Sequence, residues 1–398
     1  MTLALEVSRV RPAAWTLGLC LLAALTDGYD NQAMGVAAPA LGPALHLSRA
    51  ELGPVLSASI IGLVAGAMVC GAVADRIGRK WTLIGSLLVF ALFTSATATA
   101  WNLQSLLAIR VLAGVGIGGA MPNILALAAE ATSPERRARV TTWVTAGYPI
   151  GGALAGLAAA SLSWREIFWV GGAGPIALAV AMIFMLPESG RFLAVREARR
   201  APVLAALFGK GRALTTALLW VGGFAWVMTL YLLLNWLPTL MGDKGIGRAE
   251  ASLVSLLFNL GGVLGIVTIA PLLEARRRVW SLAAWCAGAG LAMFALALAR
   301  ADLASAGTAG FAAGVFIIGA SVALNGISPC FYPVAIRGTG VGAGVAVGRV
   351  GGIVGPLLAS ALLAAGAGAN GVLMALVPLV AAAGAAMMFL VRRPMVRD

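Results

Sequence analysis

The chain has 398 residues, of which 61% are hydrophobic and only 11% are charged. Because soluble domains carry about 25% charged residues, this composition excludes a protein whose surface mainly faces water. The net charge of +13 suggests a nucleic-acid partner, but the cations alternate between connecting segments instead of gathering in one patch, so none is expected.

Long apolar runs recur from one end of the chain to the other. Runs of about 18 residues or more are typical of membrane spans. These runs lack the strict alternation of a membrane β-barrel, so they predict helices, which satisfy their own backbone hydrogen bonds in lipid. We therefore expect an all-α membrane protein with twelve transmembrane helices, at 14–38, 52–72, 81–100, 105–129, 139–162, 166–186, 213–237, 250–273, 280–299, 307–330, 339–364 and 371–391.

The connections between these helices differ in charge. Most of the 28 Lys and Arg residues fall in alternate connections, among them Arg76, Arg79, Lys80, Arg136 and Arg137. Cytoplasmic loops carry such an excess, so both termini are expected in the cytoplasm and the protein in a bacterial inner membrane. Two arginines fall inside predicted helices instead.

A polar segment at 187–212 separates the first six helices from the last six. We interpret it as a cytoplasmic linker between bundles at 1–186 and 213–398. A weak repeat supports this division, because 71–81 resembles 270–280 at an offset of about 199, each with an acid followed by cations. Six-helix repeats are typical of transporters that bind substrate between the repeats.

The first predicted helix contains two acids, Asp27 and Asp30. An acid in hydrocarbon costs at least about 2.5 kcal/mol and indicates a functional site. Their i, i+3 spacing places them on one helix face, which Asn31 extends. At least one is expected to bind and release a proton, with Asp27 preferred. The alternative is a permanently ionised pair bonded to an arginine.

Arg110 lies inside the fourth predicted helix, at a depth similar to that of the two acids. A buried guanidinium cannot lose its proton and needs an anion. Its partner is an aspartate, a substrate carboxylate, or each in turn. If protonation of the acid frees Arg110 for substrate, the two ligands are coupled. A fixed tie between two helices is the alternative.

Arg349 lies near the middle of the eleventh predicted helix, with no acid at matching depth in the second half of the chain. A substrate carboxylate is its expected partner; backbone carbonyls and the acids of the first helix are the alternatives. Asn31, Tyr148, Asn235 and Asn259 are further substrate-binding candidates, against interhelical hydrogen bonding. Trp236 is explained equally well by an aromatic belt at the membrane interface.

Three motifs resemble the major facilitator superfamily: Gly71 to Lys80, Arg110 to Gly118 with its spaced glycines, and Leu186 to Ser189. Within that superfamily, Asp27-Gly28-Tyr29-Asp30 resembles the aromatic acid:proton symporters. So do 234–239 and 337–356, most like the 3-hydroxyphenylpropionate carriers.

The resemblance implies two pseudo-symmetric six-helix bundles around one cavity that opens to each side in turn. It also implies a conformational latch in the loop after the second helix, formed by Asp75, Arg76, Gly78, Arg79 and Lys80. The alternative role for the loop cations is topological anchoring.

These features predict proton-coupled uptake of an aromatic carboxylate, of the 3-hydroxyphenylpropionate, benzoate or hydroxybenzoate type, by a protein that acts as a monomer in contact with lipid. A drug or metabolite efflux antiporter of the same fold is the alternative. A membrane enzyme or a sensor is the rival class. The one histidine, His46, falls in a loop, and the four cysteines have no metal-binding spacing. We therefore expect no catalytic site, no metal and no cofactor.

Overall fold

The computed structural model describes residues 2–133, 136–186, 207–209, 211–274 and 278–393. The described chain is almost entirely helical and contains no strand, which confirms the predicted all-α fold class. Most of the predicted linker, 187–212, lies outside the described residues.

The chain forms two compact units. The first comprises 1–47 and 58–198, and the second comprises 48–57 and 199–398, so the start of α2 is grouped with the second unit. The helices of the first half of the chain are α1 (Thr2–Ala44), α2 (Arg49–Ile77), α3 (Arg79–Thr97), α4 (Leu103–Glu130), α5 (Arg137–Ala159) and α6 (Trp164–Met185).

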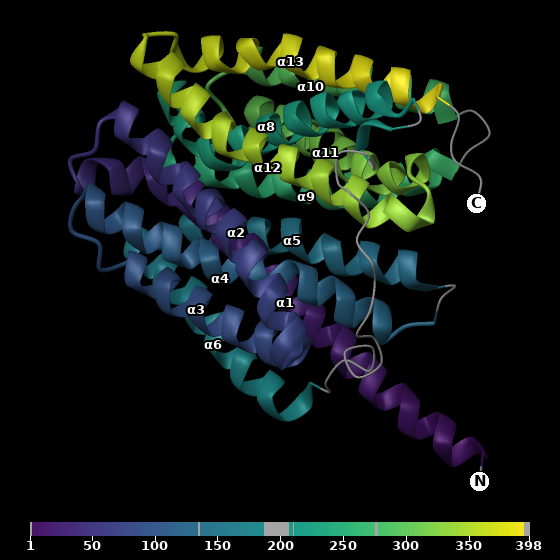
Figure 1. Cartoon of the computed structure of the whole chain (residues 1–398). Coiled ribbons are helices and arrows are strands. Elements are labelled where there is room, and N and C mark those ends of the chain that lie inside the picture. The colour runs from purple at the N-terminus through teal and green to yellow at the C-terminus, as the bar shows by residue number, and fades with distance from the viewer. Residues whose placement is uncertain (1, 134–135, 187–206, 210, 275–277, 394–398) are drawn as a thin grey trace. The chain divides into compact units, whose positions relative to one another are not determined.

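The described part of the second half also folds into long helices, coloured from teal to yellow in Figure 1. They are α8 (Ala213–Asp243), α9 (Arg248–Glu274), α10 (Arg278–Leu298), α11 (Leu303–Ile327), α12 (Val334–Ala364) and α13 (Gly368–Val391), with a short 3₁₀ helix at Ser328–Phe331 before α12. The ends agree with the predicted spans to within a few residues at many places. The largest difference is α1, which continues beyond the predicted apolar run at both ends.

Among the described residues, 10 helices are long and apolar enough to cross a membrane. The two long helices outside this set are α1 and α5. The first carries Asp27 and Asp30, and the second begins beside Arg136 and contains Arg137 and Arg139. The acids of α1 lower its apolar character, and the lower apolar character of α5 extends past its arginines into a stretch rich in threonine and glycine.

The helix pairings of the first unit recur in the second. Helix α1 packs on α5 and α6, and α3 packs on α4 and α6; correspondingly, α8 packs on α12 and α13, and α10 packs on α11 and α13. Matching glycines permit these approaches. A Cβ on Gly151 would lie 1.9 Å from the Leu25 carbonyl oxygen, and one on Gly351 would lie 2.3 Å from that of Phe224. The weak sequence repeat therefore corresponds to a repeat in structure.

Candidate functional site

The acidic segment of α1 is buried within the first unit. Asp30 has no exposed surface and Asp27 is 4% exposed. Gly28, between them, brings α1 against α5, because a Cβ there would lie 1.9 Å from the carbonyl oxygen of Tyr148. Both acids were predicted to lie inside the protein. Among the described residues, the buried acidic side chains are those of Asp27 and Asp30.

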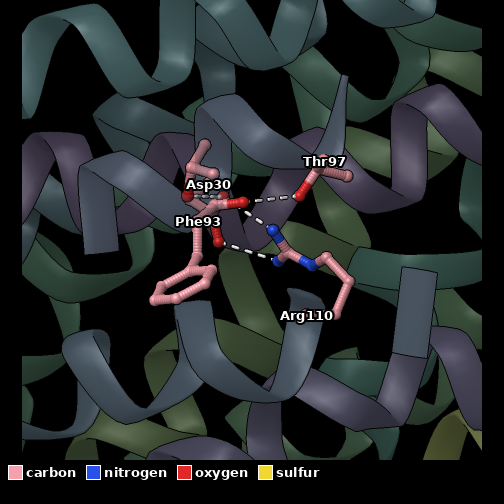
Figure 2. A network of polar contacts seen from close by, with 5 residues as sticks. Asp30, Phe93, Thr97 and Arg110 are labelled. Carbon is pink, nitrogen blue, oxygen red and sulfur yellow. Dashed lines mark hydrogen bonds and ion pairs between the residues drawn. The ribbon is translucent and has the colours of Figure 1, made fainter. Parts of the chain in front are cut away.

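Asp30 forms a bidentate ion pair with Arg110 of α4 (Figure 2). Nη1 of Arg110 donates to Oδ1 at 3.0 Å and Nη2 donates to Oδ2 at 2.8 Å. The arginine is 1% exposed, so both charges are removed from water. Arg110 was expected at a depth similar to that of the two acids, which suggested an ion pair between the first and fourth helices. The structure contains this ion pair. Such fork-to-fork pairing is strong and fixes the plane of both groups.

Two further groups complete this environment. The Thr94 hydroxyl of α3 donates to Oδ1 of Asp30 at 2.9 Å. The guanidinium carbon of Arg110 lies 5.8 Å from the ring centroid of Phe168 in α6, within the range of a cation–π contact. Thr94 was missed from the sequence, because threonines in membrane helices commonly bond to their own backbone. Thr97 does so one turn later, donating to the Phe93 carbonyl at 3.0 Å (Figure 2).

The chemistry of this cluster depends on its burial. Breaking a buried ion pair by neutralising one partner leaves an uncompensated charge in low dielectric, at a cost of about 3–5 kcal/mol. Neutralising Asp30 would therefore leave the charge of Arg110 buried without its partner.

Arg349 lies on α12 in the second unit and is half-buried. Its Nη1 donates to the Tyr231 hydroxyl of α8 at 2.9 Å. Tyr231 is 5% exposed, and its ring packs beside Gly352, where a Cβ would lie 3.3 Å from the ring. The phenol hydroxyl accepts from the guanidinium and fixes one of its nitrogens relative to α8. Tyr231 was also missed from the sequence.

Trp236 is fully buried, so the aromatic-belt interpretation is wrong for this residue. Its Nε1 donates to the Pro356 carbonyl of α12 at 3.1 Å, and a belt residue would instead reach the headgroup region. The contact ties α8 to α12, the two helices that carry Tyr231 and Arg349.

The remaining substrate candidates have different environments. The side-chain amides of Asn235 and Asn259 donate to carbonyls of their own helices, to Tyr231 at 2.8 Å and Ser255 at 2.9 Å. Asn31 is half-buried, and its Nδ2 has no hydrogen-bond partner among the described residues. The substrate-binding roles of Asn235, Asn259, Asn31 and the half-buried Tyr148 stay predictions.

The predicted latch residues lie at the end of α2 and the start of α3, which are joined at Gly78. Gly78 caps α3 at φ 94°, a left-handed conformation that favours glycine. Arg79 forms an ion pair with Glu130 at the end of α4, and Lys80 donates to the Ile183 carbonyl of α6 at 2.9 Å. Arg76 is exposed. The side chain of Asp75 lies outside the described part of the chain, and the latch role stays a prediction.

The family model of the Major Facilitator Superfamily matches residues 20–328. The chain belongs to the major facilitator superfamily. Solved structures of low sequence identity support the same fold. The nucleoside transporter NupG, as a D323A mutant, is 16% identical, with a TM-score of 0.75 over 94% of this chain and 99% of that one.

Curated relatives match this superfamily member along nearly its whole length. The 3-(3-hydroxy-phenyl)propionate transporter of Escherichia coli (strain K12) is 41% identical over 95% of this chain and 94% of the relative. The 4-hydroxybenzoate transporter PcaK of Pseudomonas aeruginosa is 35% identical over 95% and 92%. The predicted family resemblance is confirmed, and the relatives are transporters.

Proposed function

We propose that this protein is a secondary transporter that takes up an aromatic carboxylate together with protons. The observation that carries the proposal is the full-length similarity to transporters named for 3-(3-hydroxy-phenyl)propionate and 4-hydroxybenzoate. Each of these substrates is a phenol bearing a carboxylate, so a site for them needs a cation and donors near an aromatic ring. The relatives' names do not favour the alternative of a drug or metabolite efflux antiporter.

Arg349 is the proposed carboxylate-binding residue. It is half-buried, so a ligand has access to it, and Tyr231 fixes one of its nitrogens. A guanidinium offers five N–H donors in a planar fork that matches a carboxylate. Arg110 is a weaker candidate for this role, because Asp30 already holds two of its nitrogens and the side chain is 1% exposed.

Asp30 is the proposed proton carrier, supported by its ion pair with Arg110. Protonation of Asp30 from the periplasmic side weakens that pair, and release of the proton to the cytoplasm re-forms it. Asp27, preferred from the sequence, lies one turn earlier on α1 and is also buried, so it is the second proposed proton-binding residue. Asp27→Asn and Asp30→Asn separate the two roles.

The proposed cycle couples the two ligands through charge. Outside, Asp30 takes a proton, which leaves Arg110 without its counter-ion, and the substrate carboxylate on Arg349 offsets the added positive charge. A charge inside the membrane is costly, so the loaded form reorients more readily than a form that holds the proton alone. The proton gradient then drives net uptake.

The proposal extends to topology and regulation. We infer a multi-pass protein of the bacterial inner membrane with both termini in the cytoplasm, acting as a monomer in lipid and carrying out no covalent chemistry. The segment from Asp75 to Lys80 is the proposed latch of one conformation, supported by the ion pair of Arg79 with Glu130.

Purified protein in proteoliposomes tests the proposal. Uptake of labelled 3-(3-hydroxyphenyl)propionate and 4-hydroxybenzoate is measured with the outside acidic, with equal pH on both sides, and with a protonophore. The expected result is accumulation with an acidic outside that the protonophore abolishes. Uptake of either acid that ignores the pH gradient would refute symport, and proton-driven export of cationic drugs would support the antiporter instead.

A further inference from the structure

We propose that Thr94 is a positioning residue for proton coupling: its hydroxyl stabilises the ionised form of Asp30 when the empty carrier returns. The proposal rests on the proposed function, because it assigns a part in the proton cycle to a residue of α3. Thr94 has no exposed surface, and its Oγ1 donates to Oδ1 of Asp30 at 2.9 Å.

The hydrogen bonds around Asp30 show what Thr94 adds. Oδ1 accepts from Arg110 Nη1 and from Thr94 Oγ1, whereas Oδ2 accepts from Arg110 Nη2 alone among the described residues. Arg110 alone could swing together with the carboxylate as the helices shift. A third donor from a third helix ties the carboxylate to α3 as well, so its plane is fixed by two independent elements.

This arrangement affects one half of the cycle more than the other. A hydroxyl that donates to a carboxylate favours the ionised form, which the carrier must reach to release its proton and return empty. Carriers that exchange external for internal substrate stay loaded with their proton, so exchange does not pass through the ionised form. Loss of the Thr94 hydroxyl should therefore slow net accumulation and spare exchange.

The chain provides a matched control on the same helix. Thr97 also has no exposed surface, but its hydroxyl donates to the Phe93 carbonyl of α3 and not to Asp30 (Figure 2). Thr94→Val and Thr97→Val make the same chemical change at neighbouring buried sites. Thr94→Ser restores a hydroxyl at the first site.

The experiment compares these variants with the unmodified protein in proteoliposomes. Accumulation of labelled 3-(3-hydroxyphenyl)propionate under a pH gradient is measured beside counterflow at equal pH, with membrane yield and thermal stability in detergent. Thr94→Val is expected to lower accumulation about tenfold, the effect of one hydrogen bond to a charged group, and to leave counterflow within about twofold. Thr97→Val and Thr94→Ser should retain both activities.

The outcomes separate the two proposals. If the unmodified protein accumulates no substrate under the gradient, the proposed function fails. If it does and Thr94→Val matches it, only the role of Thr94 is overturned. Equal loss of accumulation and counterflow, equal loss in Thr97→Val, or no recovery in Thr94→Ser also overturns that role. If Thr94→Val does not reach the membrane, Thr94→Ala is measured with the same criteria.

Discussion

The two units share a helix scaffold and differ in the charges placed on it. Gly151 packs over the Leu25 carbonyl of α1, and Gly351 packs over the Phe224 carbonyl of α8, which puts Leu25 and Phe224 at equivalent places. Asp30 lies five residues after Leu25, and Thr229 lies five residues after Phe224, so Thr229 is the equivalent of Asp30 in the second unit.

The same reasoning locates the equivalent of Arg110. A Cβ on Gly62 would lie 1.9 Å from the Val111 carbonyl oxygen, and one on Gly261 would lie 2.1 Å from that of Phe311. Arg110 therefore corresponds to Gly310, and the buried ion pair of the first unit corresponds to a threonine and a glycine in the second.

The difference teaches how one scaffold supports two electrostatic tasks. In the first unit the guanidinium is fully buried and neutralised by Asp30. In the second unit the guanidinium of Arg349 lies on α12, is half-buried and is held by the Tyr231 hydroxyl. The first unit therefore holds its buried guanidinium with a carboxylate, whereas in the second unit a tyrosine hydroxyl contacts a guanidinium that is only half-buried.

The largest expected effect breaks the closed pair. Asp30→Asn leaves Arg110 buried without its counter-ion and should cost about 3–5 kcal/mol in stability, seen as a lower thermal midpoint in detergent and reduced membrane yield. Thr229→Val is the control at the equivalent place. The Thr229 hydroxyl is buried with no hydrogen-bond partner among the described residues, so its removal should be neutral or slightly stabilising.

The double variant Asp30→Asn with Arg110→Gln sharpens this test. It removes both charges, so most of the lost stability should return, while gradient-driven accumulation should not. An Asp30→Asn protein as stable as the unmodified one would contradict the burial of the pair. Recovered accumulation in the double variant would contradict proton carriage by Asp30.

A smaller loss of stability is expected when a glycine at a close helix contact is replaced by alanine. Gly28→Ala forces α1 away from the Tyr148 carbonyl and should destabilise the protein by about 1–3 kcal/mol. Gly351→Ala should act similarly in the second unit. Gly18→Ala and Gly342→Ala are the controls, because a Cβ at either position meets nothing within 4 Å. Equal thermal midpoints for all four variants would refute the close packing.

Removal of the Arg349 guanidinium should alter substrate binding more than stability. Arg349→Gln is expected to raise the KM for the carboxylate substrate about tenfold or more and to change the thermal midpoint little, because the side chain is half-buried. Arg300→Gln, at an exposed position, is the control. The amide of the same acid has no carboxylate, so Arg349→Gln should not change its inhibition of transport. An unchanged KM would exclude Arg349 from carboxylate binding.

The smallest effect concerns the support of Arg349. Tyr231→Phe keeps the ring and removes the hydroxyl, so the KM should rise about two- to fivefold with little change in maximal rate. Tyr332→Phe is a matched control, because Tyr332 is also buried and its hydroxyl lies 3.0 Å from Thr216 Oγ1, away from Arg349. Equal effects of both variants would assign Tyr231 a purely structural role.

The amino-acid sequence by itself determined the helical class, most helix positions and the family. The length of the apolar runs and the distribution of charge depend only on the order of residues along the chain. Both can therefore be predicted without knowledge of packing. The meeting of Asp30 with Arg110 was also foreseeable, because each group is too costly to bury alone and both lie at similar depth.

Only the tertiary structure decided which neutral groups support these charges. Thr94 and Tyr231 resemble many other hydroxyl residues in the spans, and the burial of Trp236 against α12 has no sequence signal. A neutral hydroxyl is cheap to place in several environments, so its partner depends on the rotation and depth of the helices that happen to face it. Charges constrain their neighbours strongly enough to be read from sequence, and hydroxyls do not.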